Sequence, residues 1–221
     1  MPNVSQWLID IGISNEVLLI LCFVPIFVTT TTISRYITGI KTFGIYSPMI
    51  LSFAYYFMGA RQAVTITILV VVVSWATRNI LKKTRLHYLS RLSLVYTMNC
   101  IAIMAFIAAT SFIPSDNPVF DFRNIQPLPL AMIISITDRF VSNYIKKNLI
   151  TATRLTAETI LISLLGWAIM RINIIRNWVT DNIWLSLVAL VINYAIGKYS
   201  GTRWIEYLRF FDVIKSDERT D

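Results

Sequence analysis

The stretch SRYITGIKTFGIYSPMILSFAYYFMG, residues Ser34 to Gly59, decides how the chain must fold. Two cations, Arg35 and Lys41, lie in a glycine-punctuated segment before an apolar run of only 14 residues, Ile45–Met58. A straight helix needs ~20 residues to cross a ~30 Å hydrocarbon core. Short apolar segments interrupted by Gly or Pro are typical of backbone enclosed by protein, because lipid cannot satisfy free N–H and C=O groups. We therefore expect this stretch to lie at the functional centre.

The composition places the chain among integral membrane proteins. Hydrophobic residues make up 56% of the sequence, charged residues make up 14%, and the mean hydropathy is +0.63, whereas soluble domains carry about a quarter charged residues. The net charge of +8 could indicate a nucleic-acid partner, but in a membrane protein it more often records topology, so we expect the lipid bilayer and no nucleic acid. One histidine and two separated cysteines in apolar runs predict no metal and no cofactor.

Seven apolar runs predict an all-α protein of about seven transmembrane helices. They cover residues 17–33, 45–58, 63–77, 92–113, 125–137, 155–170 and 183–199, and none alternates with the period expected of a membrane β-strand. If all seven cross, segments 35–44, 78–91, 138–154 and 198–221 share one side and hold 16 of the 20 Lys and Arg residues. The positive-inside rule then predicts an external N-terminal segment (1–15), a seven-helix membrane domain (16–200) and a cytoplasmic C-terminal tail (201–221).

Two of the runs are short, and both contain proline. Pro48 lies near the start of the run at 45–58, and Pro127 and Pro129 lie near the start of the run at 125–137. Each short run precedes a similar series of apolar segments, which suggests an inverted three-helix repeat with a site between its halves. The alternative is that both short runs are re-entrant loops, which would place Arg61 and Arg123 on the cation-rich side and weaken the charge asymmetry.

Charges at the ends of the short runs are the main candidates for binding. Arg35 and Lys41 precede the first short run, and Asp138 and Arg139 close the second. Cations that converge there would suit a phosphate or carboxylate, with Arg offering a bidentate fork. Ordinary anchoring at the membrane interface remains the alternative for Arg35 and Lys41.

Glu158 is the most deeply placed acid in an apolar run, and Arg154 lies one helical turn away. One interpretation is a local ion pair. The other is a substrate- or proton-binding carboxylate that faces Arg35 or Lys41, because a lone charge within a bilayer is costly and therefore usually functional. Arg154 is also a candidate for binding a substrate anion.

Glycines and threonines add two further expectations. Gly39 and Gly44 flank Lys41 and Thr42 and allow a tight turn with close approach of a ligand, so Thr42 joins the anion-binding candidates. The run Thr29–Thr32 can bond back to the carbonyl groups of its own helix. Residues 140–153 have the pattern of an amphipathic helix on the inner leaflet. No nucleophile–base constellation is recognisable, so we expect no catalytic activity.

Three ordered motifs resemble a known family. RYITGIKTFGIYSP (Arg35–Pro48), PLPLAMIISITDRF (Pro127–Phe140) and GKYSGTRWIEYLRF (Gly197–Phe210) are similar to the signatures of the bacterial seven-helix membrane family that is usually fused to an inactive transglutaminase-like domain. The matching positions of the third motif are Gly197, Tyr199, Gly201, Arg203, Glu206 and Arg209. The second motif has Asp138 where the family has Glu. The arrangement also distantly resembles the small membrane subunit of poly-γ-glutamate capsule synthesis.

The resemblance implies partners and a location. Members of this family are associated with ATP-grasp ligases of the glutamate-ligase type. It therefore implies a multi-pass protein of the bacterial inner membrane that anchors such a cytosolic ligase and handles or exports its anionic amino-acid or peptide product. Any function that needs a transglutaminase-like domain would be supplied by a separate chain or be absent, and an oligomer is compatible with this role. The alternative is a stand-alone secondary transporter for an anionic amino acid or short peptide.

Overall fold

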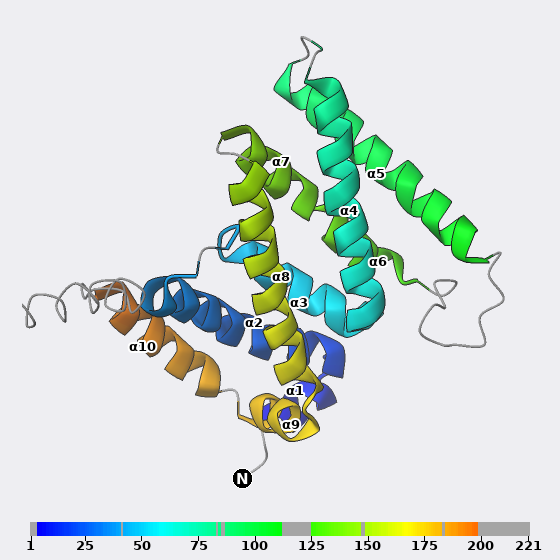
Figure 1. Ribbon diagram of the computed structural model, residues 1–221. Coiled ribbons are helices and arrows are strands. Elements are labelled where there is room, and N and C mark those ends of the chain that lie inside the picture. The colour runs from blue at the N-terminus through cyan, green and yellow to red at the C-terminus, as the bar shows by residue number, and fades with distance from the viewer. Residues whose placement is uncertain are drawn as a thin grey trace, which may run out of the picture. The chain divides into compact units, whose positions relative to one another are not determined.

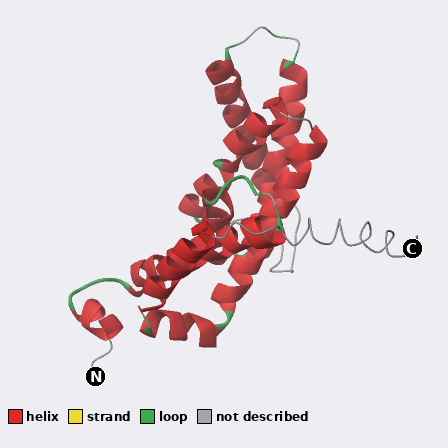
Figure 2. Ribbon diagram, turned by 90° about the vertical axis from the view of Figure 1, so that its left-hand side faces the viewer, coloured by secondary structure: helices red, strands yellow, loops and turns green. Residues whose placement is uncertain are grey.

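A computed structural model describes residues 4–40, 42–82, 84, 87–111, 125–146, 149–182 and 184–198. Every regular element in these ranges is a helix (Figure 2). Several predicted positions lie outside the described residues: Lys41, Arg123, Tyr199, Gly201, Arg203, Glu206, Arg209 and the tail 201–221. The chain forms two compact units. We call Tyr46–Arg171 the central unit, and the unit built from both ends of the chain the terminal unit.

The terminal unit is built around one long helix. It contains α1 (Val4–Asp10), α2 (Asn15–Ile33), a π-helical turn η1 (Ser34–Thr38), α9 (Asn173–Asp181) and α10 (Trp184–Lys198). Helix α2 packs against α10 and α9. The amide of Asn193 on α10 donates a hydrogen bond of 2.8 Å to the Thr29 hydroxyl on α2. Helices from the first and last parts of the described sequence therefore pack together in this unit.

The threonine run at the end of α2 bonds to its own helix. The hydroxyls of Thr29, Thr30, Thr31 and Thr32 each donate to the carbonyl oxygen four residues earlier, at 2.7–2.8 Å. Because each hydroxyl donates to a carbonyl oxygen of its own helix, the threonine side chain can lie in an apolar span. The prediction of back-bonding is confirmed, although Thr29 also accepts the bond from α10.

The described part of the central unit contains six helices, one of which is the short helix α3. These are α3 (Tyr46–Met58), α4 (Ala60–Leu81), α5 (Tyr88–Ser111), α6 (Pro127–Ile134), α7 (Ile136–Lys146) and α8 (Leu149–Arg171). Helix α3 packs against α8, α6 and α4 (Figure 1). Its buried residues are Ser47, Pro48, Leu51, Ser52, Phe53, Ala54, Tyr55 and Met58. A helix of 13 residues, about 20 Å long, is thus surrounded largely by protein.

Small polar residues let α3 and α8 approach closely. Ser52 of α3 and Ser163 of α8 are 2% and 0% exposed. The Ser52 hydroxyl lies 3.1 Å from the Ser163 carbonyl oxygen, and the Ser163 hydroxyl lies 3.1 Å from the Pro48 carbonyl oxygen. Gly166, one turn further along α8, is also buried. Small side chains and interhelical hydrogen bonds are what hold helices together in lipid, where hydrophobic association is absent.

Long helices of the central unit present apolar faces outward. Ile68, Val72 and Trp75 follow one another at helical spacing on α4, and each is at least 40% exposed. Leu94, Met98 and Ile101 do the same on α5. Exposed stripes of large apolar side chains are typical of helices that contact lipid, whereas in water they would promote aggregation.

The spans show that the chain is an all-α membrane protein. Among the described residues, four segments are long and apolar enough to cross a bilayer: Asn15–Tyr36, Ala60–Leu81, Tyr88–Thr110 and Leu149–Arg171. Helices α9 and α10 would add a fifth if they form one bent span. The two short runs form short helices, as their lengths predict. The inverted repeat involves segments of both units and stays a prediction.

Two predicted boundaries differ from the structure. The run at 125–137 is divided, because α6 ends at Ile134 and α7 begins at Ile136. At the break, the Ser135 hydroxyl donates to the Met132 carbonyl oxygen at 2.6 Å. The amphipathic helix predicted at 140–153 is wrong in extent, because α7 ends at Lys146 and residues 149–153 open the long helix α8. The apolar face of α7, including Phe140 and Val141, is buried in the central unit.

Candidate functional site

A cavity lies where α3 begins and where the chain breaks between α6 and α7. Its volume is about 300 Å³, the lower end of the range for small-molecule sites. The lining residues are Tyr46, Ser47, Ile50, Leu51, Tyr96, Met132, Ser135, Ile136, Asp138 and Arg139. Both short helices therefore contribute to one cavity, which we call the Asp138 cavity. A carboxylate and a guanidinium from adjacent residues are part of its wall.

The Asp138 carboxylate is held at the start of α7. It lies in the first turn of that helix, where the helix dipole and free N–H groups favour a negative charge. The Tyr88 hydroxyl, at the start of α5, donates to Asp138 Oδ1 at 3.2 Å. Arg139, the next residue, is exposed and can reach a ligand without being desolvated first. The cavity thus offers one fixed negative group and one accessible positive group.

A buried asparagine fixes the position of α7. Asn99 of α5 is 0% exposed, and its side-chain amide donates to the Ser74 hydroxyl on α4 and the Thr137 hydroxyl on α7, both at 2.9 Å. Thr137 directly precedes Asp138, so this three-helix connection positions the carboxylate. The Asn99 Oδ1 atom is buried and has no hydrogen-bond partner among the described residues.

A cluster of cations surrounds Tyr144 of α7. The Arg78 Cζ atom lies 5.0 Å from the centroid of the Tyr144 ring, and the Lys82 Nζ atom lies 5.4 Å from it. Arg78 is 8% exposed, and its Nε and Nη1 atoms are buried without a hydrogen-bond partner in the described part of the chain. A desolvated guanidinium costs several kcal/mol unless other groups compensate it. Cation–π contact supplies part of that compensation.

Comparison with protein families identifies the chain. Residues 7–214 match the model of a family described as seven transmembrane helices usually fused to an inactive transglutaminase. The chain belongs to this family. Comparison with curated proteins and with solved structures yields no match. The resemblance carried by the three motifs is therefore confirmed at the level of the seven-helix family, and the chain is a multi-pass membrane protein.

In this member of the seven-helix family, the charges of the central unit gather at two ends. Arg61, at the start of α4, and Arg171, at the end of α8, line a second cavity together. Arg78 and Lys82 lie at the other end of α4, beside α7. Because α4 has 22 residues, the two groups are separated along it by roughly the thickness of a bilayer. Which of these ends faces the cytoplasm stays a prediction from the sequence.

Arg154 and Glu158 form the local ion pair that was one of the two interpretations. Arg154 Nε lies 2.8 Å from Glu158 Oε1, and the two side chains are 78% and 22% exposed. An i,i+4 pair with one partner this exposed contributes little to stability. Neither residue is part of the lining of the Asp138 cavity.

Other predicted residues lie in the terminal unit. Arg35 is exposed within the turn η1. Gly39 ends that turn with φ 79°, and Gly44 has φ 88°, values that favour glycine. The Thr42 hydroxyl donates to the Gly44 carbonyl oxygen at 2.7 Å, so this hydroxyl stabilises the local turn. Gly197 is exposed in the last turn of α10.

The prolines lie at the starts of the short helices. Pro48 is the third residue of α3, while Pro127 and Pro129 are the first and third residues of α6. In the first turn of a helix the missing N–H costs no hydrogen bond, and the fixed φ suits the helix. All three prolines therefore lie in the first turn of a helix and do not interrupt it.

Sequence reasoning missed most of the groups around Asp138. Tyr88, Asn99 and Tyr144 come from α5 and α7, and Arg78 had been counted only as a topological charge. The available signal was polarity: Asn99 and Ser74 interrupt otherwise apolar stretches, and polar side chains there usually face other helices. The sequence did not show which helices would bring them together.

Proposed function

We propose that this chain is a non-catalytic membrane subunit that binds the amino-acid or short-peptide product of a cytosolic ATP-grasp ligase and handles or exports it. One observation carries the proposal: the Asp138 cavity places a carboxylate and a guanidinium in the same wall. An amino acid or peptide carries an ammonium group and a carboxylate group. Charge-assisted hydrogen bonds to both ends would select such a ligand.

The cavity wall favours binding over catalysis. Beside Asp138 and Arg139, the described lining contains two serines and two tyrosines but no histidine, cysteine or lysine, so it offers no Ser–His pair and no thiol or amine as a nucleophile. The hydroxyl of Tyr46, which is exposed at the start of α3, can donate a hydrogen bond to a second carboxylate of a glutamate-type ligand. Ile50, Leu51, Met132 and Ile136 supply the apolar part of the wall.

The proposal also includes a partner protein and an orientation in the membrane. The resemblance carried by the three motifs implies a cytosolic partner, a ligase of the ATP-grasp type. The cation-rich ends of α4 and α7 support an orientation in the bacterial inner membrane with the N-terminus outside and the C-terminus in the cytoplasm. The Asp138 cavity would then lie on the side where the ligase releases its product.

A stand-alone secondary transporter is the second candidate. It is favoured by the buried polar atoms that lack partners among the described residues, on Asn99 and Arg78, because polar groups inside a membrane bundle often line a pathway for ions or substrate. Uptake of glutamate by proteoliposomes that contain this chain alone would support the transporter. Uptake that appears only when the ligase is present would support the subunit.

Ligand binding tests the cavity directly. The probes are L-glutamate, a γ-glutamyl dipeptide and N-acetylglutamate, titrated into the full chain in nanodiscs. We expect Arg139→Gln to weaken binding of all three, and Asp138→Asn to weaken only the two ligands that have a free ammonium group, each by about 10-fold or more. Arg154→Gln is the matched control, because this arginine lies outside the cavity wall.

Two results would contradict the proposal. Binding that is equally strong in Asp138→Asn, Arg139→Gln and the unchanged chain would exclude the cavity as the binding site. Recovery of no ATP-grasp enzyme when the chain is purified from native membranes under mild detergent would exclude the stable partner, and would leave the transporter as the better description.

A further inference from the structure

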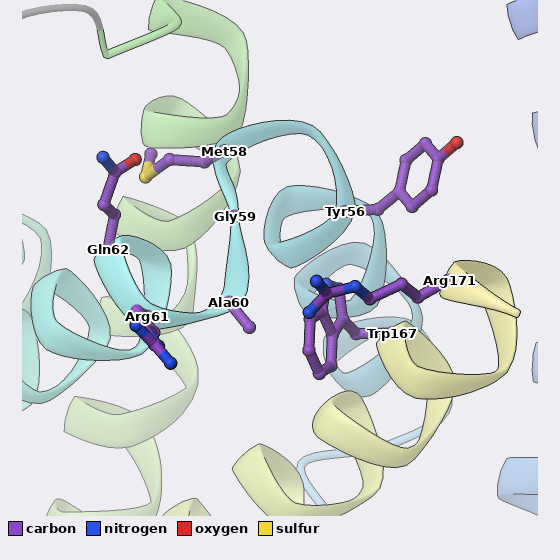
Figure 3. A pocket seen from close by; sticks show the side chains of 8 residues that line it. All are labelled: Tyr56, Met58, Gly59, Ala60, Arg61, Gln62, Trp167 and Arg171. Carbon is purple, nitrogen blue, oxygen red and sulfur yellow. The ribbon is translucent and has the colours of Figure 1, made fainter. Parts of the chain in front are cut away.

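A second cavity lies at the opposite end of α3 from the Asp138 cavity. Its volume is about 580 Å³, and it is lined by Tyr56, Met58, Gly59, Ala60, Arg61, Gln62, Trp167 and Arg171 (Figure 3). These residues come from the end of α3, the start of α4 and the end of α8. We propose that this cavity binds a phosphate group, carried by a lipid headgroup or by a free phosphate ion.

Two guanidinium groups give the cavity its charge. Arg61 and Arg171 are both exposed, and the described lining contains no acidic residue to neutralise them. Both side chains extend toward the space between α4 and α8 in Figure 3. Arginine forks bind phosphate oxygens through paired, charge-assisted hydrogen bonds, and two of them can neutralise a doubly charged group.

Trp167 orients one of the two arginines. The Arg171 Cζ atom lies 5.2 Å from the Trp167 ring, over its face (Figure 3). Stacking uses the flat face of the guanidinium and leaves the N–H groups at its edge available for an anion. A tryptophan beside an arginine at the end of a spanning helix is also the arrangement found at the headgroup level of a bilayer.

The start of α4 adds backbone donors to the same cavity. Gly59 connects α3 to α4 with φ 93° and has no side chain that could cap the helix. The first N–H groups of a helix have no carbonyl acceptor within it, and Ala60 and Arg61, which open α4, are both part of the cavity wall. An anion at this point would also meet the positive end of the helix dipole.

The site differs from the Asp138 cavity in chemistry as well as in place. The Asp138 cavity has one positive and one negative group, whereas the described lining of the Arg61–Arg171 cavity has two positive groups and no negative one. The inference is therefore independent of the proposed function, and either one can fail alone.

The experiment uses the full chain in dodecyl maltoside micelles, which contain no phosphate group that could occupy the site. One arm titrates inorganic phosphate by calorimetry. The other arm adds phosphatidylglycerol and uses native mass spectrometry to count the lipid molecules that stay bound to each protein. We expect the double variant Arg61→Gln/Arg171→Gln to bind the probe at least 10-fold more weakly. Lys198→Gln, which removes an exposed cation at the end of α10, should leave binding within about twofold, because loss of general attraction alone is a weak effect.

A second variant keeps the test decisive if the double variant fails to fold. Ala60→Glu places a carboxylate at the first position of α4, where it suits the helix dipole and competes with the anion. We expect at least a 10-fold loss with this variant too. Binding of inorganic phosphate alone, of lipid alone or of both supports the site and identifies the source. Binding of neither probe overturns the inference, as does equal binding by the variants or an equal loss with Lys198→Gln.

Discussion

Enlarging Ser163 should separate α8 from the short helix that it holds. Ser163 is 0% exposed and its hydroxyl lies 3.1 Å from the Pro48 carbonyl oxygen, so a leucine side chain has no space there. Overpacking of a buried site costs ~1–3 kcal/mol and loss of one interhelical hydrogen bond costs ~0.6 kcal/mol. We therefore expect Ser163→Leu to lower the free energy of unfolding by about 2–3 kcal/mol.

Reversible unfolding in mixed micelles, titrated with sodium dodecyl sulfate, measures this difference. Ser163→Ala isolates the hydroxyl and should cost only ~0.6 kcal/mol. Ala157→Leu is the matched control, because Ala157 lies on the same helix but is exposed, so its enlargement should change stability by less than ~0.5 kcal/mol. If Ser163→Leu and Ala157→Leu have equal effects, α3 and α8 are not closely packed and the account of the short helix is wrong.

Three further predictions concern the polar groups and the topology. A double-mutant cycle between Asn99→Ala and Thr137→Val should give a coupling energy of about 0.6 kcal/mol; a value of zero would mean that Asn99 does not position α7. Tyr144→Leu should lower the free energy of unfolding by ~1–2 kcal/mol and Tyr144→Phe by much less, because Phe keeps the ring that the cations contact; equal losses would assign the effect to the hydroxyl. In a cysteine-free background, a single cysteine at Arg61 should be labelled by a membrane-impermeant maleimide only from outside, and one at Lys82 only from the cytoplasm; labelling of both from one side would refute the charge-based orientation.

The sequence by itself determined the class of protein. Apolar run length and charge content act locally, through the transfer of each segment from water to lipid, so they can be read without knowing which helices touch. The same holds for the threonines that bond to their own helix, since each contact lies within about one turn. The Arg154–Glu158 pair was one of two interpretations of the sequence, and the structure shows that it forms. The seven-helix family was also recognisable from the sequence, because its motifs are contiguous.

Helix packing decided where the candidate sites lie. Asp138 and Arg139 were singled out from the chain. Only the tertiary structure places Tyr46 and Tyr96 in the same cavity wall and bonds Asn99 to Thr137 beside Asp138. The same is true of Arg61 and Arg171, which are 110 positions apart in the sequence. In lipid, helices associate through shape and a few hydrogen bonds, not through an apolar stripe that a pattern would reveal.

The short run at residues 45–58 shows both what the sequence predicts and what only the tertiary structure decides. Its length alone indicated that it could not span comfortably, whereas its burial by α8, α6 and α4 came only from the tertiary structure. A short helix can remain in a membrane when neighbouring helices, not lipid, cover its side chains and satisfy its ends.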